Sequence, residues 1–105
     1  MASIDRSTVL SRLRGHRAEL EAMGVRHLSL FGSQARGDAR AASDVDLGVA
    51  FDERVRADAM AYFGHRQRVA DRLAAILDAE VDLSDEAMQR PDVRERYEAE
   101  RVYAF

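Results

Sequence analysis

The chain of 105 residues has the length of one compact domain, and 47% apolar beside 33% charged residues is a globular balance. All 16 cationic side chains are arginines, and 19 acidic residues give a net charge of -3. Release of counterions from a nucleic acid would therefore add little to its binding free energy, and no direct nucleic-acid binding is expected. The absence of cysteine excludes disulfide scaffolds, thiolate zinc sites and cysteine nucleophiles.

No targeting or membrane segment is evident in the sequence. Its start lacks the apolar core of a signal peptide, and no later stretch approaches the ~20 apolar residues of a membrane span. We therefore expect a cytoplasmic protein without membrane contact. Because no repeat, low-complexity tract or linker interrupts the chain, residues 1–105 are predicted to form a single domain.

The first part of the chain predicts a helix followed by a strand. Apolar residues at near-helical spacing come after the candidate caps Asp5 and Ser7, and Gly24 supplies a stop, so we expect a helix over about residues 6–23. Residues 25–31 are short, apolar and rich in β-favouring residues, which predicts a buried strand.

A small, polar loop, residues 33–43, with room for one helical turn, precedes the second predicted strand at residues 44–49. The apolar residues of this strand share one face: Val45, Leu47 and Val49. Asp44 and Asp46 share the other face, because successive side chains of a strand alternate. That second face is therefore expected to do something other than pack.

The remainder predicts a long helix over about residues 57–78, a third short strand at residues 80–83 and a last helix that tolerates Pro91 in its first turn. Strands separated by helices indicate an α/β or α+β domain, with a small mixed sheet of three or more strands flanked by helices.

The segment 93–105 carries more apolar residues than one buried stripe of a terminal helix needs: Val93, Tyr97, Val102, Tyr103 and Phe105. Two interpretations stay open at this point. The segment contacts a partner protein, or its last residues pack back on the sheet.

Gly32 and Ser33 come directly after the first strand and predict a phosphate site. A residue without a side chain lets backbone N–H groups approach a phosphate, and a hydroxyl can donate to it. Arg36 in the same loop could reach a triphosphate through its planar fork, or brace the loop by pairing with a carboxylate such as Asp38.

Asp44 and Asp46 are two residues apart on one strand face, so their carboxylates can converge on a pair of metal ions ~3.5–4 Å apart. Ligation by oxygen alone selects Mg²⁺, or Mn²⁺. Asp82, between Val81 and Leu83, would join them if the third strand lies beside the second. The structural alternative for the pair is a solvated strand end.

The spacing of these residues resembles a known signature. Gly32 and Ser33, ten residues, then Asp44 and Asp46 match the pattern of the DNA polymerase β-like nucleotidyltransferase superfamily. The fuller run of residues 31–37 and 43–47 is similar to its minimal nucleotidyltransferase branch, whose members are paired with HEPN-domain toxins. The resemblance covers nearly the whole chain, since Asp82 and the segment Glu98–Ala104 fall where that branch has its third aspartate and its last helix.

The resemblance implies a polymerase β-like fold and a concrete reaction. An acceptor hydroxyl would attack the α-phosphorus of ATP, pyrophosphate would leave, and AMP would be transferred with the help of two Mg²⁺ ions. Asp44, Asp46 and Asp82 would be the metal-binding and catalytic residues, with Asp82 helping to deprotonate the acceptor. Gly32, Ser33 and Arg36 would bind the nucleotide.

The same resemblance implies an antitoxin that adenylylates a tyrosine of a HEPN ribonuclease toxin and forms a hetero-oligomer with it. One alternative is an inactive antitoxin that masks the toxin by binding. Another is an enzyme for small molecules such as antibiotics, which is disfavoured because the chain leaves no room for the additional helical domain that seats such acceptors.

Overall fold

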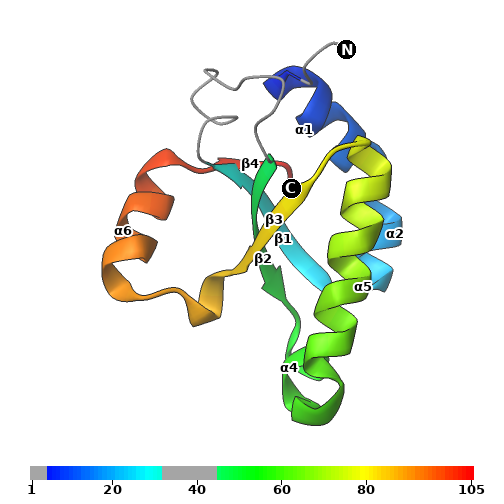
Figure 1. The fold of residues 1–105 in the computed structure, drawn as a ribbon, viewed down its shortest axis with the longest axis vertical. Coiled ribbons are helices and arrows are strands. Elements are labelled where there is room, and N and C mark those ends of the chain that lie inside the picture. The colour runs from blue at the N-terminus through cyan, green and yellow to red at the C-terminus, as the bar shows by residue number, and fades with distance from the viewer. Residues whose placement is uncertain (1–4, 32–44) are drawn as a thin grey trace.

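The computed structural model describes residues 5–31 and 45–105, which form a mixed sheet with helices on both faces (Figure 1). The strands are β1 (Val25–Phe31), β2 (Val45–Phe51), β3 (Val81–Asp85) and β4 (Val102–Tyr103). Their order in the sheet is β3-β2-β1-β4. The pair β2–β3 is parallel, while β1 is antiparallel to both β2 and β4. The predicted α/β class and mixed sheet are confirmed.

The chain begins with two short helices, where the sequence predicted one. They are α1 (Arg6–Gly15), capped by the Asp5 side chain, which accepts from the Thr8 N–H at 2.8 Å, and α2 (Arg17–Ala22). His16 breaks the predicted helix at φ -109° and ψ 15°. Its ring Nδ1 lies 2.9 Å from the Arg12 carbonyl oxygen, and Gly15 before it is a weak helix former. The apolar periodicity hides this break because residues on both sides of it pack into the core.

Two further helices, α4 (Glu53–Ala57) and α5 (Ala59–Leu77), connect β2 to β3. The long predicted helix corresponds to α5, which ends at Asp78 with φ 51° in the left-handed region. That conformation turns the chain directly into β3, and it completes the crossover that a parallel strand pair requires.

The chain then passes through a 3-10 turn, η1 (Glu86–Met88), into α6 (Pro91–Glu100). Pro91 occupies the first turn of α6, as predicted. The prediction of a last helix over Glu98–Ala104 is wrong in its second half. Residues 102–103 form β4 because β1 offers a free edge for backbone pairing.

The end of the chain packs back on the sheet, as the second interpretation of this segment predicted, while a partner contact of residues 93–105 stays a prediction. The Ala104 N–H donates to the Leu28 carbonyl oxygen at 2.8 Å, and Ala104 is buried. Arg14 of α1 also donates to the Ala104 carbonyl oxygen at 2.8 Å. These bonds tie the tail to β1 and α1.

The core lies between one face of the sheet and helices α1, α2 and α5, while α6 covers part of the other face (Figure 1). The side chains from the sheet that fill this core are Val25, Leu28, Leu30, Val45, Leu47, Val49, Phe51 and Leu83. Among the helices that the structure describes, none is long and apolar enough to cross a membrane.

Candidate active site

The candidate site begins with a row of three residues across the sheet. Phe31 of β1 is the register partner of Asp46 in β2, and Asp46 is the partner of Asp82 in β3. Directly opposed residues of neighbouring strands point to the same face. Asp82 is exposed and Asp46 is half-buried. The third strand therefore lies beside the second, which was the condition for Asp82 to join the site, and the pairing brings these two carboxylates to one face.

Core packing fixes this arrangement. Val45, Leu47 and Val49 are each 0% exposed, and Leu83 is 5% exposed. Because these apolar residues alternate with Asp46 and Asp82, their burial turns both aspartates to the opposite face. A slip of one residue in the β2–β3 register would expose the apolar set, so register and carboxylate position are set by the same burial.

The other predicted site residues lie outside the described residues: Gly32, Ser33, Arg36 and Asp44. The described residues that flank this segment are Phe31 and Val45, which adjoin Asp46 along or across the strands. In the described part of the chain, no group of three or more His, Asp or Glu side chains could hold a metal ion. Asp46 and Asp82 supply two carboxylates, and Asp44 would have to supply the third.

Below the row of Phe31 and the aspartates, the same face is covered by Tyr97 of α6. A Cβ atom on Gly48 would lie 2.2 Å from the Tyr97 hydroxyl oxygen and 2.5 Å from two ring carbons. The Phe31 ring meets the Tyr97 ring edge to face, with centroids 5.0 Å apart. Tyr97 thus packs against the end of β1, the strand that precedes the predicted phosphate-binding residues in the chain.

Tyr97 is 2% exposed, and burial is the main cause that raises its pKa to about 12. Its hydroxyl and that of Ser29, the register partner of Gly48, are buried without hydrogen-bond partners among the described residues. Sequence reasoning treated Tyr97 only as one apolar residue of the last segment. The available signal was Gly48, since a glycine inside a strand marks close approach by another group.

An ion pair holds the end of α6 against η1 beside this site. Arg101 donates to a carboxylate oxygen of Glu86 at 2.8 Å, and both side chains are largely buried. The Arg101 guanidinium also lies over two aromatic rings, 5.5 Å from the centroid of Tyr97 and 4.7 Å from that of Tyr103. Cation–π contacts of this length are favourable. Together they hold α6 to η1 and β4.

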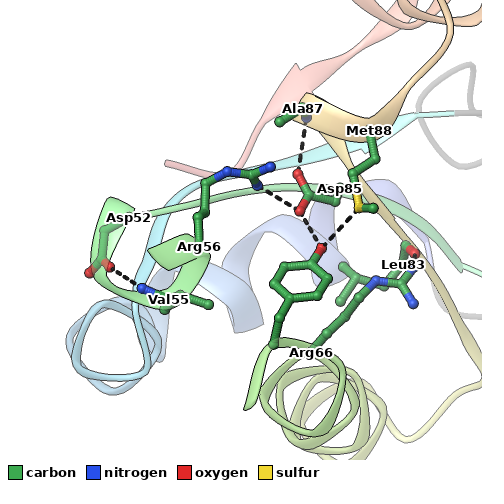
Figure 2. Close-up of polar contacts among 9 residues, drawn as sticks. Asp52, Val55, Arg56, Arg66, Leu83, Asp85, Ala87 and Met88 are labelled. Carbon is green, nitrogen blue, oxygen red and sulfur yellow. Dashed lines mark hydrogen bonds and ion pairs between the residues drawn. The ribbon is translucent and has the colours of Figure 1, made fainter. Parts of the chain in front are cut away.

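A second carboxylate of β3, Asp85, lies on the strand face opposite to that of Asp82. It makes a separate cluster of polar contacts (Figure 2). Its side chain is 1% exposed and accepts hydrogen bonds from Arg56 at 2.8 Å, the Ala87 N–H at 3.0 Å and the Tyr62 hydroxyl. Burial first, and then this bond, raise the pKa of Tyr62 to about 12. Asp85 is thus a satisfied buried anion that links β3 to α4 and α5.

Sequence reasoning missed Asp85. The signal that could have found it is the alternation itself, because Asp85 falls on the apolar side of β3 with Leu83. A carboxylate at such a position is expected to be buried and paired. Its saturation by three donors separates it from Asp82, which points from the other face.

A model of the nucleotidyltransferase domain family matches residues 10–104. The chain belongs to this family. The match spans the strands that carry Asp46 and Asp82 as well as the helices that pack beneath them. Within the family the chain is similar to the minimal nucleotidyltransferases, as the resemblance of residues 31–37 and 43–47 predicted.

Three relatives illustrate the similarity of this chain to known proteins. A protein adenylyltransferase, MntA, of Thermococcus cleftensis is 44% identical over 54 residues, which is 50% of this chain and 54% of that protein. This chain therefore matches about half the length of that relative. A solved structure of a candidate minimal nucleotidyltransferase is 29% identical and superposes with a TM-score of 0.79, covering 97% of this chain and 98% of that one.

The third relative is in a complex from Shewanella oneidensis, a tri-AMPylated HEPN toxin with its MNT antitoxin. It shares 20% identity and a TM-score of 0.61, over 91% of this chain and 71% of that one. This likeness concerns the fold. It confirms that the mixed sheet and its helices have the architecture of a nucleotidyltransferase domain.

Proposed function

We propose that the protein is a metal-dependent nucleotidyltransferase that transfers AMP from ATP to a tyrosine hydroxyl of a cognate HEPN ribonuclease toxin, and so acts as its antitoxin. The observation that carries the proposal is the pairing of Asp46 with Asp82 on one face of the parallel strands β2 and β3. Because the chain belongs to the nucleotidyltransferase domain family, we interpret this pair as metal ligands.

Asp44, Asp46 and Asp82 would hold two Mg²⁺ ions, or Mn²⁺, because adjacent carboxylates offer the oxygen ligands that these ions prefer. When bound, the ions neutralise charge on the attacking and the leaving oxygens. Metal binding thus accounts for an aspartate pair at the end of the strand face that Tyr97 covers at Gly48. The ligand set is a proposal because Asp44 lies outside the described residues.

The chain's own residues would bind and orient the triphosphate and accept the proton of the acceptor hydroxyl. Gly32 and Ser33 would cradle the triphosphate, and Arg36 would reach it from the same loop. Asp82 would take the proton of the acceptor hydroxyl, whose oxygen bonds to the α-phosphorus while the bond from that phosphorus to the bridging oxygen breaks. Pyrophosphate leaves, and AMP stays on the acceptor.

The proposed acceptor is a protein because of what the similar proteins act on or bind. One is a protein adenylyltransferase, and another is an MNT antitoxin in a complex with an AMPylated HEPN toxin. These likenesses favour a hetero-oligomer over a small-molecule enzyme. We also propose that residues 1–105 form one domain and act in the cytoplasm without contacting nucleic acid directly.

The test is incubation of the purified protein with a HEPN partner, Mg²⁺ and ATP labelled in the α-phosphate. We expect label on a tyrosine of the partner and release of pyrophosphate, with loss of the partner's ribonuclease activity. If the partner is inhibited without becoming labelled, the protein is a masking antitoxin. If it is neither bound nor labelled, the proposed function is wrong.

A further inference from the structure

A cavity of about 300 Å³ opens between the end of β3, η1 and the start of α6. Ser84 of β3 lines it and lies on the same strand face as Asp82, two residues earlier. The strand rise puts the Cα atoms of these two residues about 7 Å apart. The cavity therefore adjoins the residue that we propose as the proton acceptor.

Gln89 lines this cavity and has an unusual environment. Its amide nitrogen and its amide oxygen are both buried, and neither has a hydrogen-bond partner among the described residues. Leaving both atoms without hydrogen bonds is unfavourable. The free energy is therefore lower if the amide turns into the cavity and forms hydrogen bonds there with a partner. One peptide unit of another chain supplies both an N–H and a C=O group for that purpose.

The rim of the cavity is apolar on one side. Met88 and Val93 line it and are 59% and 46% exposed. The Tyr62 hydroxyl oxygen, whose proton is donated to Asp85, lies 3.3 Å from the Met88 sulfur (Figure 2). Two large apolar side chains at the mouth of one cavity offer an anchor for an apolar residue of a partner.

The charged lining is positive, although the chain as a whole carries -3. Arg66 and Arg90 line the cavity, and Asp85, the carboxylate among the described lining residues, is already paired with Arg56. The Arg90 side chain is 82% exposed, and its contact with Asp92 is long, at 3.7 Å. An acidic partner segment complements this lining.

We propose that this cavity docks the acceptor segment of the protein partner. The segment is an extended stretch with an apolar residue against Met88 and Val93 and an acidic residue facing Arg90. Because an extended chain covers about 3.3–3.6 Å per residue, a docked residue next to Ser84 places the hydroxyl-bearing residue two or three positions away over Asp82. This inference rests on the proposed function and assigns the acceptor side of its site.

The test uses two variants of the cavity, Arg90→Glu and Val93→Asp, with Arg54→Glu as the matched control. Arg54 is 92% exposed on α4 and does not line the cavity. Transfer of labelled AMP to the HEPN partner is measured at varied partner concentration. We expect each cavity variant to raise the KM for the partner about tenfold or more with a smaller change in kcat, and the control to stay within about twofold.

Affinity for Mg²⁺-ATP, measured by calorimetry, should be the same for all four proteins. Cavity variants that keep the wild-type KM would overturn the docking site while leaving the transferase intact. If the wild-type protein labels nothing, the proposed activity fails, and the docking site is judged by calorimetric titration with the unlabelled partner. Weaker binding of both cavity variants supports the site there, whereas equal affinities, or no binding at all, refute it.

Discussion

Asp46 and Asp82 are register partners in the parallel pair of β2 and β3, although α4 and α5 separate them in the chain. The pairing places two carboxylates side by side on the face opposite the main core. Their position depends on the burial of Leu47 and Leu83, the next register pair. The chemistry proposed for this face is therefore coupled to the packing of the other face.

Gly48→Ala should destabilise the protein because the new methyl group would meet the Tyr97 ring and hydroxyl at 2.2–2.5 Å. Overpacking of this kind costs about 1–3 kcal/mol, and each kcal/mol lowers Tm by about 4–8 °C in a domain of this size. Thermal unfolding followed by circular dichroism measures the effect. Gly15→Ala is the control, since a methyl group there would lie more than 4 Å from the described residues outside its own helix backbone and chain neighbours.

A double-mutant cycle identifies the cause of the Gly48→Ala effect. With Tyr97→Leu in the background, the same alanine should cost clearly less, because the clashing ring is gone. Additive free-energy changes would mean that the alanine acts through the strand itself and not through Tyr97.

Stability should fall when the pH rises from about 10 to 12. Tyrosine in the unfolded chain releases its proton near pH 10, whereas burial raises the pKa of Tyr62 and Tyr97 to about 12 in the folded protein. The folded state thus binds these protons more tightly, and its advantage is complete below pH 10 and lost above the folded pKa. The loss is on the order of 1–3 kcal/mol per tyrosine.

Phenylalanine variants check this pH dependence by urea unfolding at pH 8 and pH 11.5. Tyr97→Phe should lose less stability between these pH values than the wild type, and it should cost little at pH 8 because the hydroxyl it removes has no hydrogen-bond partner within the described residues. Tyr103→Phe, at an exposed side chain, is the control. A Tyr97→Phe protein with an unchanged pH profile would contradict the assignment.

Deletion of residues 103–105 should lower Tm by more than about 10 °C. The deletion removes the bonds of Ala104 and Phe105 to Leu28, at 2.8–3.4 Å, and the anchor for Arg14. The contrary result is an unchanged Tm together with loss of co-purification with the HEPN partner. That result would mean that residues 103–105 contact the partner and do not stabilise the fold.

Gly32→Val should weaken Mg²⁺-ATP binding more than Ser33→Ala, because a branched side chain blocks the backbone approach to the phosphates. A hydrogen bond to a charged group contributes about 1.5–3 kcal/mol, so the serine variant should lose roughly one to two orders of magnitude in affinity. Calorimetric titration decides the matter. Wild-type affinity in both variants would place the triphosphate elsewhere.

The sequence predicted the parts of the fold that depend on local alternation and periodicity. β1, β2, β3 and α5 follow from apolar patterns, whereas Asp82 was predicted to join Asp46 only if the third strand lies beside the second, which the β2–β3 pairing shows. The break at His16 was missed because the helical apolar period runs through it.

The contacts of Tyr97, Asp85 and β4 were also missed, for a different physical reason. Each depends on a partner distant in the chain: Gly48 for Tyr97, Arg56 for Asp85 and Leu28 for the residues after β4. Such pairings follow from tertiary packing, which local patterns do not specify. Gly32, Ser33, Arg36 and Asp44 remain sequence predictions, because they lie outside the described residues.

The most direct test of the account is AMP transfer by Asp46→Asn and Asp82→Asn, compared with Asp71→Asn on the exposed surface of α5. Each protein is incubated with the HEPN partner, Mg²⁺ and α-labelled ATP, and its fold is checked by thermal unfolding. Since metal ligands supply several kcal/mol of transition-state stabilisation, both site variants should lose at least about a hundredfold in kcat while staying folded, and the control should keep wild-type activity. Transfer at the wild-type rate by both site variants would contradict the two-metal nucleotidyltransferase.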